Sequence, residues 1–328
     1  MGKSEISYFK EVGGHVWNPI TGCQGIGCAV REPCYAKRII KARPAIHGIK
    51  MGLGGSWSKS EPLAPERVPF NNVQFHPDRL NEPLKRRKPT VYGVGFFGDI
   101  GDKQVQKEWV HKILHVTEQR PEHEFVFLTK HPENFVPIIV NHWTSDGSRL
   151  KNCWFGVTVN TQADLWRAEE LLKVSGKRWL SIEPMWEPID LHLSTPCDKN
   201  CNEFQYAECP GTSGPCIMQR RFDLVVVGGE SGKDARPMHP DWVRSIRDQC
   251  QAAGVMFNLK QNGEWIPYDM RIGTVHSRNR IYTSRNRTGK RNEVMIADGG
   301  QYFERVGLKR AGRTLDGREW TQLPWRKA

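Results

Sequence analysis

Three cysteines stand close together near the start of the chain. Cys23, Cys28 and Cys34 follow the spacing C-x4-C-x5-C. Three thiols cannot all pair into disulfides, and a closed zinc site needs a fourth ligand at knuckle spacing, which neither His15 nor His47 supplies. Three thiolates do hold an iron–sulfur cluster that leaves one iron open to a substrate or cofactor. The spacing therefore favours an iron–sulfur centre with an open coordination position.

Two other interpretations of these three cysteines stay open. A zinc ion could take its fourth ligand from a distant part of the chain. The thiols could also be inert core residues, although the surrounding loop is polar and rich in glycine, which argues against burial in an apolar core. A Cys–His nucleophile would not need three thiols.

A second group of four cysteines falls within residues 195–221, which interrupt the pattern of expected strands and helices. Its members are Cys197, Cys201, Cys209 and Cys216. Four thiols in one insertion suit a closed structural site, with zinc favoured over an auxiliary iron–sulfur cluster. A reduced loop without metal is the alternative.

The elements that must position these groups follow a regular alternation. Short apolar runs alternate with helical stretches, and we expect helices over 102–119, 161–176 and 239–254. The runs expected as buried parallel strands are 14–20, 90–99, 124–130, 152–160, 177–184, 222–232 and 255–263. Strand–helix alternation predicts right-handed βαβ units, so about seven strands indicate an α/β fold, a full or partial parallel (β/α) barrel. We expect this barrel to span 1–263, with a C-terminal extension over 264–328.

Polar residues stand at the ends of nearly all the expected strands. In a parallel barrel the chemistry gathers at these carboxyl ends, so the pattern predicts a polar ring around the barrel mouth. Capping of the following helix is the competing explanation, above all for Asn160. The residues in question are Asp99, Thr129, Lys130, Asn160, Glu183, Glu230, Lys260 and Gln261. Two glycine-rich runs, 93–102 and 227–232, add backbone room beside an acidic group that could accept an ammonium group or ribose hydroxyls.

The charge balance points to a polyanionic partner. Lys and Arg number 48 against 36 Asp and Glu, a formal net charge of +12. The tract 271–291 holds seven basic residues, six of them Arg, and no acidic residue, which favours phosphate binding and base stacking. A solvated loop is the alternative there. We expect nucleic acid as the partner.

The apolar residues bound the class of protein. Apolar residues make up 38% of the chain, enough for a substantial core. No apolar run approaches the roughly 18 residues that a bilayer span needs, and the first residues lack an apolar signal core. We therefore expect no membrane partner, a cytoplasmic location and reduced cysteines.

The order of these motifs resembles the radical S-adenosylmethionine (SAM) superfamily, and more closely a phage- and bacteria-associated family of radical-SAM-like proteins. The spacing of the cysteines departs from the superfamily's usual C-x3-C-x2-C, and the aromatic Tyr35 follows the third cysteine rather than preceding it. The motifs that carry the resemblance are WNPITGC (17–23), CYAKR (34–38), FLTKHPENF (127–135), FGVTVNTQ (155–162), LSIEPM (180–185), VVVGGESGKDARPMHPDWVRSIRDQC (225–250), KQNGEW (260–265) and LDGREW (315–320).

The resemblance implies a cofactor set. Cys23, Cys28 and Cys34 would bind a [4Fe–4S] cluster whose open iron takes the amino and carboxylate groups of SAM. Gly98 and Asp99 would contact the SAM amino group. An external electron donor would reduce the cluster, and cleavage of SAM would yield a 5′-deoxyadenosyl radical that abstracts hydrogen from the substrate. The residues implied for the SAM and substrate pocket are Thr129, Lys130, Glu183, Gly229 and Glu230.

Together these patterns and the resemblance predict a radical SAM enzyme that modifies a nucleic-acid base or nucleotide. The resemblance alone implies a phage setting, DNA hypermodification in a host cytoplasm. A radical SAM enzyme acting on a peptide or small metabolite is one alternative, and a non-catalytic, zinc-containing nucleic-acid-binding protein is another. Catalytic roles are expected for Lys130, Glu183, Glu230 and Lys260. Cofactor binding is expected for Gly98, Asp99, Thr129, Asn160 and Gly229.

Overall fold

A computed structural model gives the three-dimensional structure of the chain. It describes residues 6–28, 34–47, 49–50, 66–142, 150–193, 222–267, 281–285, 291–296 and 302–325. The chain divides into two compact units. Unit 1 comprises residues 1–157 and 173–176, and unit 2 comprises residues 158–172 and 177–328.

Seven strands form one sheet in the order β1-β6-β7-β8-β9-β10-β11. They are β1 (His15–Trp17), β6 (Val91–Val94), β7 (Glu124–Thr129), β8 (Cys153–Thr158), β9 (Lys177–Ile182), β10 (Leu224–Gly228) and β11 (Met256–Gln261). Each of the seven expected strand runs contains one of these strands. Their order in the sheet follows the chain, and the short strands that lie between β1 and β6 in the sequence are not part of this sheet. This is the strand order of a partial parallel (β/α) barrel, so the predicted fold class is confirmed.

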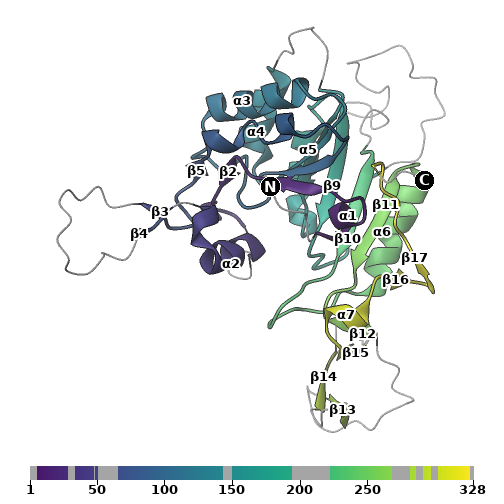
Figure 1. Cartoon of the computed structure of the whole chain (residues 1–328). Coiled ribbons are helices and arrows are strands. Elements are labelled where there is room, and N and C mark those ends of the chain that lie inside the picture. Colours follow the sequence, from purple (N-terminus) through teal and green to yellow (C-terminus); the bar gives the residue numbers. More distant parts are fainter. Residues whose placement is uncertain are drawn as a thin grey trace, which may run out of the picture. The chain divides into compact units, whose positions relative to one another are not determined.

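In unit 1, the strands β1, β6, β7 and β8 pair in parallel. Their register aligns Trp17 with Val94, Val94 with Phe127 and Phe127 with Phe155. All four side chains are buried, because the runs are apolar on both faces and helices cover a parallel sheet. The main helices of this unit are α3 (Lys107–Glu118) and α4 (Pro132–Val140), which are labelled in Figure 1.

Short elements connect the strands of unit 1. They are α1 (Ser7–Lys10), β2 (Ile20–Thr21), α2 (Tyr35–Ala42), β3 (Ile49–Lys50), β4 (Glu66–Arg67), β5 (Gln74–Phe75) and the 3-10 turns Pro44–Ile46, Pro77–Arg79 and Pro83–Lys85. The two-residue strand β2 pairs antiparallel with β5. Cys23 lies two residues after β2, so this pair holds the strand from which the cysteine loop begins.

In unit 2, the strands β9, β10 and β11 pair in parallel, with Ile182 beside Val227 and Val227 beside Leu259. The 3-10 turn Gln162–Asp164 leads into α5 (Leu165–Leu171), and α6 (Pro240–Ala252) packs beside β11 (Figure 1). Helix α6 begins where the His239 imidazole accepts a hydrogen bond from the Asp241 backbone N–H.

The C-terminal residues of unit 2 form antiparallel structure. Strands β12 (Trp265–Pro267), β13 (Ile281–Arg285), β14 (Arg291–Ile296) and β15 (Tyr302–Arg305) make a sheet in the order β12-β15-β14-β13, and α7 (Leu308–Ala311), β16 (Thr314–Leu315) and β17 (Arg318–Glu319) follow. The Leu259 N–H donates to the Trp320 carbonyl at 2.8 Å, so the segment after β17 covers the outer edge of β11. The expected domain boundary at 263/264 stays a prediction.

Candidate functional site

The loop that carries the first cysteine is joined to the glycine-rich segment after β6. Gly22 and Gly98 form a parallel bridge, and the Gly22 N–H donates to the Phe97 carbonyl at 2.9 Å. A Cβ on Gly98 would lie 2.6 Å from the Gly22 carbonyl oxygen, so this close approach requires glycine. Gly98, predicted to contact SAM, therefore has a structural reason to be glycine, and its predicted role in SAM binding stays a prediction.

A second carboxylate, which the sequence reasoning missed, holds the turn after Cys23. The Asp102 Oδ2 accepts the Gln24 N–H at 2.7 Å, and its Oδ1 accepts the Gln104 N–H at 2.9 Å. Asp102 is buried, so these two bonds fix the cysteine loop to the loop after β6. The repeated acid in the run GDIGD, residues 98–102, was the available signal.

The surroundings of Cys23 disfavour a free thiolate. Burial raises the pKa of the Cys23 thiol, and the nearby carboxylates of Asp99 and Asp102 raise this pKa further. The Gly25 N–H, 3.2 Å from Sγ, acts in the opposite direction. A positively charged partner on the sulfur would reverse this balance, since metal coordination deprotonates a thiol outright.

The other two thiols of the cluster are also free and partly exposed. The Cys28 N–H donates to the Gly25 carbonyl at 3.3 Å, and Cys34 precedes α2, whose Tyr35 hydroxyl donates to the Phe96 carbonyl. Among the described residues, no group of three or more His, Cys, Asp or Glu side chains is gathered to hold a metal ion. The segment 29–33, between two of the predicted ligands, lies outside the described residues.

Asp99 joins the loop after β6 to the end of β7. Its carboxylate accepts the N–H groups of Gly101 and Lys130, each at 3.0 Å, and the Thr129 hydroxyl. Thr129 Oγ1 in turn accepts the His131 N–H at 2.9 Å. Asp99 and Thr129 thus hold backbone in place, whereas the Lys130 ammonium group has no ion-pair partner among the described residues.

Unit 2 brings a second set of predicted residues together at the ends of β9 and β11. Glu183 Oε2 and Lys260 Nζ form an ion pair at 2.9 Å. Gly228 lies between their strands, and a Cβ there would stand 3.4 Å from Glu183 Cγ. Glu183 Oε1 is buried and has no hydrogen-bond partner within the described parts of the chain. A buried carboxylate oxygen without a partner is an open position for a ligand or water.

The segment after β10 carries the remaining predicted residues, Gly229 and Glu230, and pairs Glu230 with Arg236, which was not predicted. Glu230 Oε2 accepts from the Arg236 Nε at 2.8 Å and from the Arg236 backbone N–H at 3.1 Å. The Arg236 guanidinium lies over the Trp186 ring, 4.1 Å from its centroid. Gly229 approaches the Asn262 carbonyl so closely that a Cβ would stand 2.5 Å from its oxygen.

Asn160, at the end of β8, is buried and holds backbone. Its side-chain N–H donates to the Pro184 carbonyl at 2.8 Å, and its backbone N–H donates to Asp164 Oδ2 at 3.0 Å. Capping of the following turn is done by a reciprocal pair of hydrogen bonds between Thr161 and Asp164 instead. The predicted role of Asn160 in cofactor binding stays a prediction.

Two predicted features fall largely outside the described residues. The four cysteines of 195–221 all do, and so does most of the basic tract 271–291, of which β13 and the start of β14 are described. The predicted zinc or auxiliary cluster and the predicted nucleic-acid contact of the tract therefore stay predictions.

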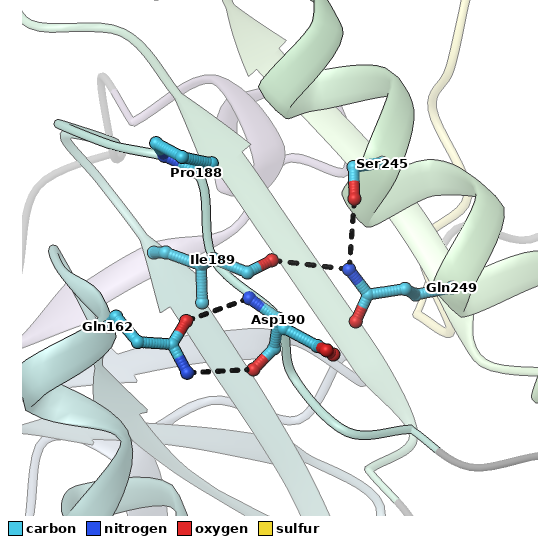
Figure 2. A pocket seen from close by; sticks show the side chains of 6 residues that line it. All are labelled: Gln162, Pro188, Ile189, Asp190, Ser245 and Gln249. Atoms are coloured by element: carbon cyan, nitrogen blue, oxygen red, sulfur yellow. Dashed lines mark hydrogen bonds between the residues drawn. The ribbon is translucent and has the colours of Figure 1, made fainter.

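A shallow pocket in unit 2 lies apart from the predicted site residues, none of which lines it (Figure 2). The Asp190 N–H donates to Gln162 Oε1 at 2.8 Å, and Gln249 Nε2 donates to the Ile189 carbonyl at 3.2 Å and to Ser245 Oγ at 3.2 Å. These amides already have partners. They join the segment after β9 to α6 and the turn before α5, a structural role.

The described residues define an α/β protein with a parallel barrel-type sheet, a thiol-bearing loop after its first strands and charged pairs at later strand ends. The chain belongs to the family described as "Protein of unknown function (DUF5131)", whose sequence model matches residues 3–324. No curated protein matches the chain. Within the described residues, no helix is long and apolar enough to cross a membrane.

Several solved structures are similar to this chain. One is a double mutant of spore photoproduct lyase with bound AdoMet and dinucleoside spore photoproduct, at 9% identity and a TM-score of 0.37, covering 93% of this chain and 78% of that one. Another is spore photoproduct lyase complexed with dinucleoside spore photoproduct, at 9% identity and a TM-score of 0.38, covering 95% and 79%.

Proposed function

We propose that the chain is a radical SAM enzyme that modifies a nucleic-acid base or nucleotide. The observation that carries the proposal is the loop after β2, which presents three free, partly exposed thiols while its backbone is bonded to the glycine-rich segment after β6. Cys23, Cys28 and Cys34 would hold the cluster, with Asp102 fixing the turn that follows the first of them. When bound, the cluster and SAM supply the one-electron chemistry that yields a 5′-deoxyadenosyl radical.

The donor set fits an iron–sulfur cluster. Thiolates are the usual ligands of such clusters, and three of them leave one iron free. The carboxylates that raise the Cys23 pKa also favour a positively charged partner at that sulfur. The chain's own residues then have defined tasks: Asp102 positions the first thiol, and Asp99 holds the ends of two loops together.

Charge supports nucleic acid as the substrate class. The chain carries a net charge of +12, and Lys130 follows the end of β7 in unit 1, while the exposed Arg236, paired with Glu230, lies between β10 and α6 in unit 2. A peptide or small metabolite would not call for this charge balance. Glu183 and Lys260 are the proposed acid–base pair toward the substrate, because they are joined at 2.9 Å and one carboxylate oxygen stays open among the described residues.

The test is anaerobic reconstitution of the whole chain with iron and sulfide. We expect about four irons per chain, as in a [4Fe–4S] cluster, and dithionite-dependent cleavage of SAM to methionine and 5′-deoxyadenosine. Cys23→Ser, Cys28→Ser and Cys34→Ser should each lose iron and cleavage. Cys250→Ala is the matched control, since Cys250 is buried in α6, and it should keep both.

Three results would contradict the proposal. Zinc bound without iron would instead support a non-catalytic zinc protein. Iron retained in all three serine variants would show that these three cysteines are not the ligands of the cluster. SAM cleavage without any binding of single-stranded or duplex nucleic acid at low salt would move the substrate to a peptide or small metabolite.

A further inference from the structure

Arg236 presents a planar, exposed guanidinium in the segment between β10 and α6 of unit 2. Its side chain is 54% exposed, whereas that of its partner Glu230 is only 11% exposed. The Cζ atom of the guanidinium lies over the Trp186 ring, 4.1 Å from the ring centroid. The arrangement is a layered pair with an aromatic ring beneath and a planar cation above.

The plane of this guanidinium is held by a carboxylate. Glu230 accepts from Arg236 Nε at 2.8 Å, from its Nη2 at 3.4 Å and from its backbone N–H at 3.1 Å. The Nε/Nη2 edge, which would otherwise fork a phosphate, is therefore already occupied. What Arg236 offers to a ligand is mainly its exposed face, and Glu230 acts as a positioning residue for it.

The supporting ring also has an unused polar group. Trp186 lies in the segment after β9. Its backbone N–H donates to the Asn160 carbonyl at 3.2 Å, which holds the backbone of Trp186 in place. Its indole Nε1 is buried and has no hydrogen-bond partner in the part of the chain that the structure describes, as is also true of Glu183 Oε1 three residues earlier. One donor and one acceptor thus stand open in the same short segment.

We propose that Arg236, supported by Trp186, is a stacking platform for a nucleobase of single-stranded nucleic acid. A planar cation on an aromatic ring stacks on any base, because every base has a π-face. The protein's net charge of +12 also attracts the negatively charged strand to which the base belongs. The inference rests on the proposed function and deepens it by naming a contact for its substrate. Its test requires neither iron nor catalysis.

The experiment measures binding of the metal-free, full-length protein to two labelled single strands of equal length by fluorescence anisotropy. One strand is oligothymidylate, and the other carries abasic tetrahydrofuran units at the same number of phosphates. We expect the wild type to bind oligothymidylate about tenfold more tightly than the abasic strand, the effect of about one stacked base. Arg236→Lys keeps the charge but not the plane, and should reduce this ratio to about one.

Matched variants separate stacking from charge and from misfolding. Arg244→Ala removes another arginine, located on α6, whose guanidinium also forms ion pairs with carboxylates. This variant should keep the tenfold ratio. Glu230→Gln should lower the ratio only partly, because it loosens the guanidinium without touching the base. Thermal unfolding of each variant identifies any that does not fold, and Glu230→Gln then serves in place of Arg236→Lys.

Several outcomes would overturn the inference. An unchanged ratio in Arg236→Lys would leave charge as the whole effect. If Arg236→Lys weakens binding of SAM to the reconstituted protein while the oligothymidylate ratio persists, the platform serves the adenine of SAM instead. Absence of wild-type preference for bases would refute the platform, whereas the iron and SAM-cleavage results would still stand for the radical SAM assignment.

Discussion

At the scale of single residues, the cysteine loop depends on carboxylates that come from elsewhere in the chain. Asp102 receives two backbone N–H groups and Asp99 receives two more together with a hydroxyl. Backbone groups, rather than arginine or lysine side chains, are thus the partners that these carboxylates hold. Their negative charges raise the pKa of Cys23, so the same residues that position the thiol also shape its electrostatics.

Removing Asp102 should loosen the cysteine loop. We expect Asp102→Ala to lower the free energy of unfolding by about 1–3 kcal/mol, because the N–H groups of Gln24 and Gln104 lose a buried acceptor. Denaturant unfolding measures this change, and iron per chain after reconstitution should fall in parallel. Asp78→Asn, at an exposed acid, is the control and should shift stability by less than about 0.5 kcal/mol. Full iron loading of Asp102→Ala would refute the positioning role.

Two histidines beside the cysteine loop should make stability depend on pH. Burial lowers the pKa of His76 to about 4 and also lowers that of His47, and both rings bond to the Thr21 hydroxyl at 2.8 Å. The folded pKa lies below the unfolded value of 6.5, so the unfolded chain binds protons first as pH falls. Stability is therefore full above about pH 6.5 and is lost as pH falls toward 4.

The free energy of unfolding is measured from about pH 7.5 to about pH 5. This range covers the upper part of the window between the unfolded pKa of 6.5 and the folded pKa of about 4 of His76. We expect a loss of about 1 kcal/mol from His76 at pH 5, allowing for screening at a side chain that keeps some exposure. His76→Gln should make the profile shallower and leave the part that His47 contributes. The exposed His192 is the comparison, and His192→Asn should retain the wild-type slope. Identical slopes in both variants would refute the assignment.

At the scale of elements, the bridge between Gly22 and Gly98 joins two loops that follow different strands. One loop carries the first thiol, and the other carries Asp99. In unit 2 the corresponding feature is the row of strand ends at β9, β10 and β11. Gly228 lies there between the strands that carry the ion pair Glu183–Lys260. Only the first place requires glycine, because backbone lies where a Cβ on Gly98 would stand, whereas a Cβ on Gly228 would meet its neighbours at an ordinary contact distance of 3.4 Å.

Gly98→Ala should separate the two loops of unit 1. The added methyl would stand 2.6 Å from the Gly22 carbonyl oxygen, a contact that only backbone movement relieves. We expect a loss of about 1–3 kcal/mol in the free energy of unfolding and lower iron retention. Gly228→Ala is a stability control, because its nearest contacts would be at 3.4 Å, and it should change stability little. Equal stability of the two variants would contradict the bridge's role.

At the scale of the whole molecule, the net charge of +12 sets the expected response to salt. Affinity for oligothymidylate should fall by about two orders of magnitude between roughly 50 and 200 mM salt for about five neutralised phosphates, since counterions are released on binding. Anisotropy titrations at several salt concentrations measure the slope. A neutral morpholino strand of the same sequence is the control and should show little salt dependence. A flat response with the charged strand would argue against phosphate contacts.

Local pattern was enough to predict the order of the seven sheet strands, the helices α3, α5 and α6, and the polar character of the strand ends. The apolar runs containing Trp17, Phe127 and Val227 identified buried strands, because burial on both faces leaves a continuous apolar signal. The spacing of Cys23, Cys28 and Cys34 likewise identified the candidate ligands, since it is visible within a dozen residues.

The tasks of the polar residues depended on tertiary structure. Asp99, Asn160 and Asp102 each hold backbone groups, which their positions in the sequence do not reveal, and the predicted ligand-binding roles of Asp99 and Asn160 stay predictions. The contacts of Arg236 with Glu230 and Trp186, from which we propose a stacking platform, are likewise visible only in the tertiary structure. Hydrogen bonding and burial are properties of pairs, and Gln24 meets Asp102 across 78 residues of chain only because strand crossovers bring their loops together.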